Sequence, residues 1–419
     1  MNMNKKKNKK IKGKRWLIGV MGGLCLLGLS GCADNTELQA VLPETTQMVY
    51  PPETVVVPTQ EQLLDRYMET LTLEEKVGQL FYVTVGNLEQ PVGEGSNTQK
   101  AVNDTIRQTI TQYHPGGVIL MGDNLESDEQ VQMLNLELQE TSEIPLFIGV
   151  DEEGGTVSRL GGTPGITTMN VGSMAVIGQT GDPNQAYQTG TYLGSELKRL
   201  GFNMDFAPVA DVLTNAGNYE IGSRSFGSDP ELVSDMVTAE IGGLQSEDIS
   251  AVVKHFPGHG GVIGNSHKNL QYVEVTQEEL EGTMLPPFQA AAESGVDAVL
   301  VSHLVLDDVD ADTPSSLSES VVQGMLRTEL KYQGVVITDS FQMGSITENY
   351  TQAEAAVRAI QAGDDMILMP LDYAACYQGV LQAVQDGQLT EEQINLACRR
   401  VLQTKIKRGI LILRSDSPQ

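Results

Sequence analysis

Eight short apolar runs recur along this chain of 419 residues, each followed by a Gly-rich or polar turn and a longer amphipathic stretch. Continuous apolar strands that alternate with helices are typical of a parallel sheet covered on both faces. Eight such units are the number that closes a barrel, so the sequence predicts an α/β fold, a single (β/α)8 TIM barrel. A doubly wound open sheet is the alternative. The runs lie at residues 77–86, 116–122, 145–155, 202–212, 249–260, 296–306, 334–344 and 364–370.

Polar side chains interrupt these runs at or just past their carboxyl ends. A purely structural origin would scatter such residues over both ends of the strands. Active sites of this barrel type are built at the carboxyl face, so we expect one there. The residues are Asp151, Lys254, His255, His303 and Asp339.

The N-terminus has the form of a secretory signal peptide. Residues 1–15 hold eight basic groups and no acid, and the apolar stretch 16–31 is too short for a membrane span of about 20 residues. This stretch runs into the sequence LSGC, which resembles a bacterial lipobox that ends in Cys32. We therefore predict a bacterial lipoprotein that is extracytoplasmic and membrane-anchored through Cys32. An ordinary signal peptide with a chance cysteine is the alternative.

Composition changes again after the signal peptide. Residues 33–60 carry four prolines and no glycine, which is typical of an extended, flexible tether. A helical pattern follows, in which Thr72 and Glu75 resemble a capping box, and a last helix is predicted at 390–408. The predicted organisation is a lipoprotein signal peptide, a lipidated Cys with its Pro-rich tether, the barrel and a short tail, with bounds 1–31, 32–60, 61–412 and 413–419.

Charge and cysteine content exclude several classes of protein. With 27 Lys and Arg against 55 Asp and Glu, the net charge of −28 argues against a nucleic-acid partner. No CxxC pair is present, so a zinc ribbon or a thioredoxin-like site is not supported. Cys25 leaves with the signal peptide. Cys376 and Cys398 either form a disulfide, which an exported setting permits, or remain buried and unpaired.

Histidine is concentrated in one segment. KHFPGHG begins at Lys254 and continues through a Gly-rich stretch to His267, so three of the five histidines lie within thirteen residues. A metal site is one interpretation, but the Pro and Gly of this segment exclude a helical i, i+4 display, and there is no HExxH pattern. The other interpretation is a sugar or anion clamp with His267 as general acid/base, because imidazole titrates near neutral pH.

Asp339 directly follows the apolar strand at 334–338, which predicts that its carboxylate lies at the barrel mouth. An N-cap for the next helix is the structural alternative. A carboxylate nucleophile together with an acid/base group is the equipment of a retaining glycosidase.

Five motifs together resemble one family. They are KHFPGHG with a following SH, VVITDSFQMG, NMDFAPVADV, IGSRSFGSDPELV and GVDEEGGTVSRL. Over residues 60–412 the chain resembles glycoside hydrolase family 3, in particular its β-N-acetylglucosaminidases of the NagZ type. The resemblance implies a single barrel that removes terminal β-linked N-acetylglucosamine with retention, without a metal ion or other cofactor. The implied substrates are small glycans such as peptidoglycan fragments or chito-oligosaccharides, and we expect a monomer.

The resemblance also implies individual roles. Asp339 matches the nucleophile that forms the glycosyl-enzyme, and His267 matches the acid/base. Carboxylate and cationic side chains can together accept from and donate to the hydroxyls of a pyranose. The residues that match sugar contacts are Asp151, Arg159, Arg224, Lys254 and His255.

Three positions depart from the family pattern. Glu152 stands where Gln is common, and Thr156 where a basic residue is common. Asn265 stands where the family has an Asp that holds the acid/base imidazole, and an amide supplies no negative charge. Three explanations stay open: an active enzyme in which Glu152 or Glu153 helps His267, a slower or phosphorolytic enzyme, and a non-catalytic sugar-binding lipoprotein.

The remaining expectations concern the surroundings of the site. His303 either supports the pocket or makes core hydrogen bonds, and His114 is expected to be structural. Met343 and Met369 are expected to pack beneath the site. Trp16 is the only Trp and is lost with the signal peptide, which favours a compact pocket for one terminal sugar over a long groove.

Overall fold

Each of the eight predicted runs contains one strand of a single parallel sheet. The computed structural model describes residues 58–93, 95–262 and 269–414. Cys32, Asn265 and His267 therefore lie outside the described residues, as do the predicted signal peptide and nearly all of the tether. The strands are β1 (Phe81–Thr84), β2 (Gly117–Ile119), β3 (Phe147–Val150), β6 (Met204–Asp205), β7 (Ser250–Phe256), β9 (Ala298–Val301), β11 (Val335–Thr338) and β12 (Ile367–Leu368).

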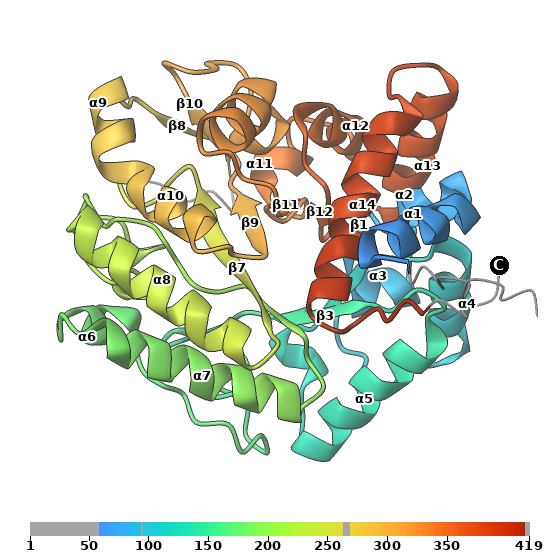
Figure 1. Ribbon diagram of the computed structural model, residues 1–419, viewed down its shortest axis with the longest axis horizontal. Coiled ribbons are helices and arrows are strands. Elements are labelled where there is room, and N and C mark those ends of the chain that lie inside the picture. The colour runs from blue at the N-terminus through green and yellow to red at the C-terminus, as the bar shows by residue number, and fades with distance from the viewer. Residues whose placement is uncertain (1–57, 94, 263–268, 415–419) are drawn as a thin grey trace, which may run out of the picture. The chain divides into compact units, whose positions relative to one another are not determined.

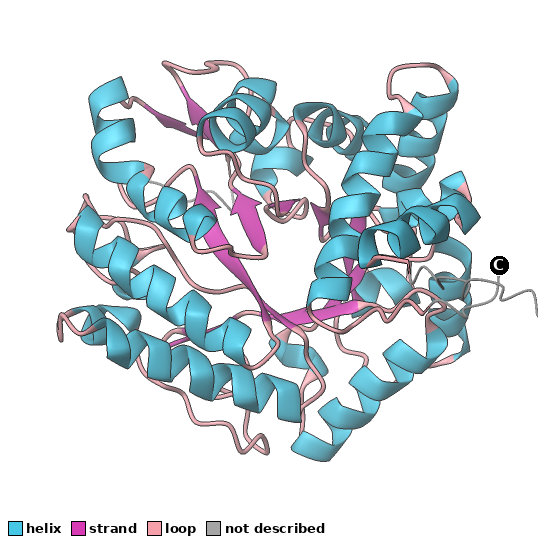
Figure 2. Cartoon of the chain, in the orientation of Figure 1, coloured by secondary structure: helices cyan, strands magenta, loops and turns pink. Residues whose placement is uncertain are grey.

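The strands close into a barrel. Their order is β11-β9-β7-β6-β3-β2-β1-β12, and every neighbouring pair is parallel. A further parallel bridge between Ile337 and Met366 joins the two ends of this row. Figure 1 and Figure 2 show the strands in the middle, with helices around them. The predicted (β/α)8 barrel is confirmed, and the open-sheet alternative is wrong.

Helices fill the connections between successive strands, and further helices precede β1 and follow β12. They are α1 (Gln60–Thr70), α2 (Leu73–Gly78), α3 (Val85–Glu89), α4 (Asp104–Tyr113), α5 (Asp128–Thr141), α6 (Met174–Gly178), α7 (Pro183–Arg199), α8 (Pro230–Ser246), α9 (Gln277–Glu279), α10 (Pro286–Glu293), α11 (Gly344–Thr347), α12 (Gln352–Ala362), α13 (Tyr373–Gln385) and α14 (Glu391–Lys407). The 3-10 helices are η1 (Gly122–Asn124), η2 (Gly222–Arg224) and η4 (Ser315–Leu317), and the π helices are η3 (Leu280–Met284) and η5 (Ser320–Glu329).

Two small sheets lie outside the barrel. β4 (Glu152–Gly154) pairs antiparallel with β5 (Val157–Ser158), directly after the third barrel strand. β8 (Gln271–Val273) pairs parallel with β10 (Leu304–Leu306). Both follow the carboxyl ends of barrel strands and therefore belong to the mouth.

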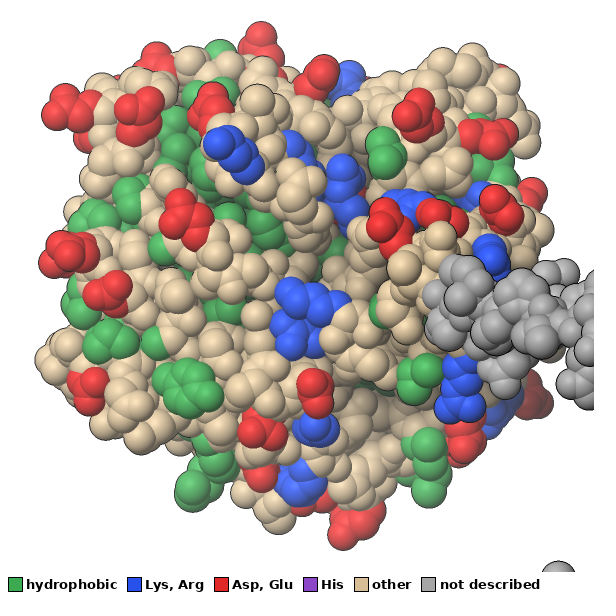
Figure 3. Space-filling view, viewed as in Figure 1, with side chains coloured by type: hydrophobic (Ala, Val, Ile, Leu, Met, Phe, Trp, Pro, Cys, Tyr) green, Lys and Arg blue, Asp and Glu red, His purple; other side chains and the backbone are tan. Residues whose placement is uncertain are grey.

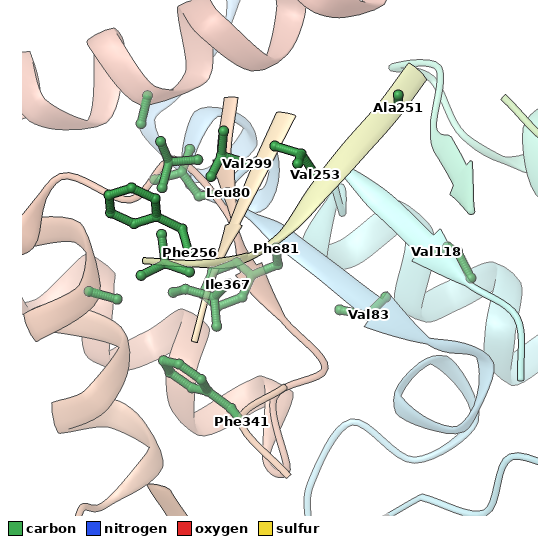
Figure 4. Close-up of a cluster of buried hydrophobic side chains, with 14 of the residues drawn as sticks. Leu80, Phe81, Val83, Val118, Ala251, Val253, Phe256, Val299, Phe341 and Ile367 are labelled. Atoms are coloured by element: carbon green, nitrogen blue, oxygen red, sulfur yellow. The ribbon is translucent and has the colours of Figure 1, made fainter. Parts of the chain in front are cut away.

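The barrel strands are buried on both faces, which explains their unbroken apolar sequence. Along β1, Tyr82 packs with the cluster that fills the barrel interior, whereas Phe81 and Val83 pack with the layer between strands and helices. Figure 4 shows members of this outer layer from several strands, among them Val118 and Val299. The interior is therefore a packed core rather than a channel.

The last helix, α14, closes the amino-terminal base of the barrel. It matches the predicted 390–408 and begins at a capping box formed by Thr390 and Gln393. Val401 of this helix packs with the interior cluster, and Lys405 lies over the ring of Phe147. On the face shown in Figure 3, which α14 crosses, acidic and basic side chains are both scattered, and a group of basic side chains lies near the middle.

Two smaller predictions are tested by the structure. Thr72 and Glu75 form the predicted capping box of α2. Cys376 and Cys398 are both buried, free thiols, so the disulfide alternative is wrong. Within the described ranges, no helix has both the length and the hydrophobicity needed to cross a bilayer.

Candidate active site

A cavity of ≈ 470 Å³ lies at the carboxyl ends of the barrel strands, as predicted. Every predicted site residue within the described ranges lines it, whereas Asn265 and His267 fall outside those ranges. Met343 and Met369 also line the cavity, so they form part of its wall rather than only packing beneath it. The predicted residues in the wall are Asp151, Arg159, Arg224, Lys254, His255 and Asp339.

Lys254 is the centre of an ion-pair network in the cavity wall. Its Nζ lies 2.7 Å from Oδ1 of Asp151 and 2.6 Å from Oε1 of Glu153. Arg224 binds the same Glu153 carboxylate in a bidentate manner, through Nε at 2.7 Å and Nη2 at 2.8 Å. Arg159 lies farther out, with Nη2 3.9 Å from Oδ2 of Asp151. The network holds two carboxylates and three cations around the cavity.

Mutual pairing keeps these buried groups charged. Burial alone would raise the pKa of the Glu153 carboxyl, but Lys254 and Arg224 lower it to about 2. Burial would likewise lower the pKa of Lys254, but the charges of Asp151 and Glu153 raise it above its usual value. The cavity therefore holds permanent charges over the physiological pH range.

Asp211 orients His255, a role that its position in the sequence does not predict. Its Oδ2 lies 2.7 Å from Nδ1 of His255, and its Oδ1 accepts from the backbone N–H of His259 at 2.6 Å. Although burial opposes it, the charge of His255 holds the pKa of the Asp211 carboxyl below its usual range. With Nδ1 held by a carboxylate, Nε2 of His255 lies 3.3 Å from Nη2 of Arg224 and faces the cavity side.

Asp339 is held at the end of β11 rather than at a helix. Its backbone N–H donates to the Val301 carbonyl at 2.8 Å, and its Oδ1 accepts from the backbone N–H of Ser340 at 2.7 Å. The next helix, α11, has Met343 at its N-cap position, so the N-cap interpretation of Asp339 is wrong.

His303 holds the backbone just after Asp339 through a hydrogen bond to Ser340. It is 1 % exposed, its Nδ1 lies 2.7 Å from Oγ of Ser316, and its Nε2 lies 3.0 Å from the Ser340 carbonyl oxygen. His303 therefore fulfils both predicted roles. Its buried side chain makes core hydrogen bonds, and one of these bonds supports the pocket by holding Ser340, the residue next to Asp339.

Glu220 and His259 are two further cavity residues that the sequence argument left without a role. Oε2 of Glu220 lies 3.6 Å from Nε2 of His259, and both side chains line the cavity. Burial and the charge of His255 lower the pKa of His259, which favours its neutral form. His259 belongs to the KHFPGHG motif, but the only available signal for Glu220 is its position just before the SRSFG segment.

Glu152 and Glu153 have other roles than helping an acid/base. Glu152 is fully buried, accepts from the hydroxyl of Ser158 and from the backbone N–H of Leu160, and does not belong to the cavity lining. Glu153 is occupied by Lys254 and Arg224. Among the described carboxylates of the cavity, Glu220 is therefore better placed than either to face an imidazole.

A family comparison agrees with this geometry. Residues 72–404 match the model of the family described as "Glycosyl hydrolase family 3 N terminal domain". A beta-N-acetylglucosaminidase structure of this family, from Paenibacillus sp. str. FPU-7, superposes with a TM-score of 0.75 and 38% identity over 83% of this chain and 65% of that chain.

Curated relatives are named beta-hexosaminidases. Beta-hexosaminidase A of Pseudoalteromonas piscicida is 28% identical over 368 residues, which cover 80% of this chain and 61% of that protein. Beta-hexosaminidase LpqI of Mycobacterium tuberculosis is 32% identical over 308 residues, which cover 71% of this chain and 77% of that protein. The chain thus spans somewhat less than two thirds of the first relative and of the Paenibacillus chain.

Proposed function

Because the chain belongs to glycosyl hydrolase family 3, we propose that it is a retaining exo-β-N-acetylglucosaminidase. It acts on terminal β-linked N-acetylglucosamine of small glycans, such as peptidoglycan fragments or chito-oligosaccharides. The observation that carries this proposal is the placement of Asp339 in a cavity whose wall also holds paired cations and carboxylates. The names of the bacterial relatives support the same substrate class.

In the proposed reaction, Asp339 attacks the anomeric carbon and forms a covalent glycosyl-enzyme. The glycosidic C–O bond breaks, and the leaving oxygen takes a proton from His267. Water then attacks the same carbon, His267 takes its proton, and the bond to Asp339 breaks. Two inversions at one carbon give net retention, and no cofactor is consumed.

The cavity wall supplies the grip on the sugar. Arg159 and Arg224 donate hydrogen bonds, Asp151 accepts them, and Lys254 holds Asp151 in place while donating from the remaining position of its ammonium group. Asp211 holds Nδ1 of His255, so that Nε2 is turned toward Arg224 on the cavity side. Fixed charges in a small cavity suit one terminal pyranose better than an extended polysaccharide.

A paired assay tests this proposal. Purified protein is given an aryl β-N-acetylglucosaminide and the matched aryl β-glucoside at pH 7, with and without inorganic phosphate. We expect release of the aryl group from the first substrate, with free sugar as product. Absence of turnover on both substrates contradicts the hydrolase proposal, and a sugar phosphate as the main product shows the phosphorolytic alternative.

Asn265 leaves open how the acid/base is supported. Reversal by Asn265→Asp separates the explanations: a large rise in kcat identifies an impaired enzyme, and an unchanged, high kcat indicates that another group supplies the charge. No turnover in either form, with sugar binding retained in calorimetry, indicates a sugar-binding lipoprotein. We favour an active enzyme with Glu220 as the helping carboxylate, because it lines the cavity and lies beside an imidazole.

We further propose that Cys32 anchors the protein to a membrane outside the cytoplasm and that the barrel acts as a monomer, without a nucleic-acid partner. The lipobox-like LSGC sequence supports the anchor, and the net charge of −28 supports the last point. Fractionation of cells that express the wild type or Cys32→Ala tests the anchor. We expect the activity in the membrane fraction for the wild type and in the soluble fraction for the variant.

A further inference from the structure

Three metal-ligating side chains converge on the base of the barrel, far from the cavity. Glu75 lies in α2 before β1, His114 follows α4 before β2, and Glu143 lies between α5 and β3. All three precede the amino ends of strands, so they lie at the opposite end from the mouth. One ring nitrogen and one oxygen from each carboxylate all lie within 4.8 Å of one another.

Hydrogen bonds hold the Glu75 carboxylate and the backbone of His114 in place. The Glu75 carboxylate closes the capping box of α2 by accepting from the Thr72 backbone N–H at 2.7 Å. His114 ends α4 in the left-handed region with φ 47°, and its carbonyl accepts from Nε2 of Gln79 at 2.8 Å. A Cβ at Gly78 would lie 2.5 Å from the His114 carbonyl oxygen, so only glycine lets α2 pack on this chain end.

The cluster is unbalanced in charge. Among the residues that the structure describes, no Lys or Arg lies within ion-pair distance of Glu75 or Glu143. The His114 ring makes no hydrogen bond to any of the described residues. The three donor atoms lie within 4.8 Å of one another, which is close enough for one ion to contact all three after small side-chain adjustments. His114 and Glu75 are half-buried, which lowers the cost of ordering them, and the exposed Glu143 can adjust.

We propose that Glu75, His114 and Glu143 bind a divalent first-row transition-metal ion, with Zn²⁺ as the best-fitting probe. An imidazole nitrogen with two carboxylate oxygens is a donor set that Zn²⁺ accepts, whereas Ca²⁺ and Mg²⁺ take oxygen ligands. Zinc bonds to such ligands are about 2.0–2.2 Å long, and the exposed Glu143 side chain is free to rotate toward an ion held by the other two residues. Three protein ligands leave a fourth position for water.

The bound ion would link three segments that are distant in sequence. It joins α2, the end of α4 and the turn before β3, all on the base, and no cavity residue takes part. Because the ion binds only the folded arrangement, it raises the stability of the protein by mass action. The role is structural and does not depend on the proposed glycosidase activity.

The test uses the metal-free, full-length protein with ZnCl₂ alone. Calorimetry is expected to show one zinc ion bound at this site, and thermal unfolding is expected to shift upward with zinc. Three variants remove one donor each and keep the backbone: Glu75→Gln retains the capping box, His114→Asn tolerates the left-handed region, and Glu143→Gln is exposed. Each is expected to weaken zinc binding at least about tenfold, and Glu140→Gln on α5 serves as the charge-matched control.

Circular dichroism without metal shows that the variants are folded. Zinc affinity that is unchanged in His114→Asn, or no binding to the wild type up to millimolar zinc, overturns the proposal. Zinc binding that persists in the three variants but is lost in His259→Gln places the ion in the cavity and also overturns it. Equal affinity for Mg²⁺ contradicts the assignment to a transition metal.

Discussion

The two ends of the barrel each bury a lysine, and they treat it in opposite ways. At the mouth, Lys254 lies between the carboxylates of Asp151 and Glu153, which raise its pKa despite burial. At the base, Lys405 is fully buried, and burial lowers its pKa to about 7. Its Nζ donates to Oε1 of the neutral Gln79 at 2.6 Å and lies 5.2 Å from the centre of the Phe147 ring.

The difference shows that partners, and not burial alone, decide whether a buried group stays charged. At the mouth, Lys254 stays charged and lies where a polar ligand could contact it. Its charge depends on the carboxylates of Asp151 and Glu153, so removal of either partner would leave a buried charge unpaired. The base places its lysine among neutral and apolar groups, where the charge serves no ligand. Under the proposed function, the charges at the mouth contact the sugar, whereas the lysine at the base is part of the packed core.

The largest expected effect is on turnover and concerns Asp339 at the mouth. Asp339→Asn keeps the shape of the side chain but removes the attacking carboxylate, so we expect kcat to fall by at least about 1,000-fold. Binding of N-acetylglucosamine, measured by calorimetry, is expected to remain because Asp151 and the cations are untouched. Turnover within tenfold of the wild type would show that another group is the nucleophile.

The next effect is on stability and breaks the network at the mouth. Lys254→Met leaves two carboxylates without their shared cation, and removal of one partner of a buried pair costs about 3–5 kcal/mol. Urea unfolding at pH 7 measures this loss of free energy. Lys198→Met is the matched control, because its pair with Asp248 is exposed and is worth at most about 1 kcal/mol. Equal effects of the two variants would contradict the network.

The mouth also predicts an acid limit of stability. Glu153 has a folded pKa of about 2 and an ordinary value of 4.5, so the folded state binds fewer protons than the unfolded state between these values. Its stabilising contribution is present above pH 4.5 and is lost as pH falls toward 2. In Lys254→Met this dependence is expected to shrink, because the main cause of the low pKa is gone.

Features that depend on the local chain could be predicted from the sequence. Strands buried on both faces produce unbroken apolar runs, so all eight were predicted, although β6 spans only two residues of its run at 202–212. The motif residues at strand ends were brought together in the cavity as expected. Position at a strand end is a local property of the chain, and the barrel topology then determines the rest.

Partners contributed by loops could not be predicted in this way. Asp211 and His255 are 44 residues apart, and Glu220 reaches His259 from a loop with no periodic pattern. The role of Glu152 depends on the hairpin of β4 and β5, which returns Ser158 and Leu160 to it. At the base, helical spacing places Lys405 four residues after Val401, on the buried face of α14, but it does not reveal the partner Gln79, which is 326 residues away.

Lys405→Met tests the base half of the comparison. Between pH 7 and its ordinary pKa of 10.5, the folded wild type binds fewer protons than the unfolded chain, so its stability rises with pH by up to about 1.4 kcal/mol per unit. The variant lacks this rise, and we expect it to be at least as stable as the wild type at pH 6. Urea unfolding at pH 6, 8 and 9.5 measures the slopes, with Lys198→Met as the control. Parallel slopes for Lys405→Met and wild type would show that this lysine stays protonated in the fold.

The smallest expected effect concerns Glu240, in a helix of the barrel wall between the two ends. Here the stability is expected to fall as pH rises, opposite to the effect of Lys405. Glu240 of α8 is fully buried, and neither carboxyl oxygen has a hydrogen-bond partner among the described residues. Burial, with the nearby charge of Glu153, raises its pKa from 4.5 to about 8. The folded state then holds a proton that the unfolded chain releases above pH 4.5, so stability falls as pH rises from 4.5 to 8.

Glu240→Gln removes this fall, and the variant is expected to gain stability relative to the wild type between pH 5 and pH 8. The slope is bounded by about 1.4 kcal/mol per unit, and the gain is smaller than at Lys405 because the amide still lacks partners, whereas Met fills the base with apolar atoms. Glu231→Gln, exposed on the first turn of the same helix, is the control. A constant difference between Glu240→Gln and wild type across this range would mean that Glu240 is ionised in the fold, and that a buried charge need not be paired even beside the mouth.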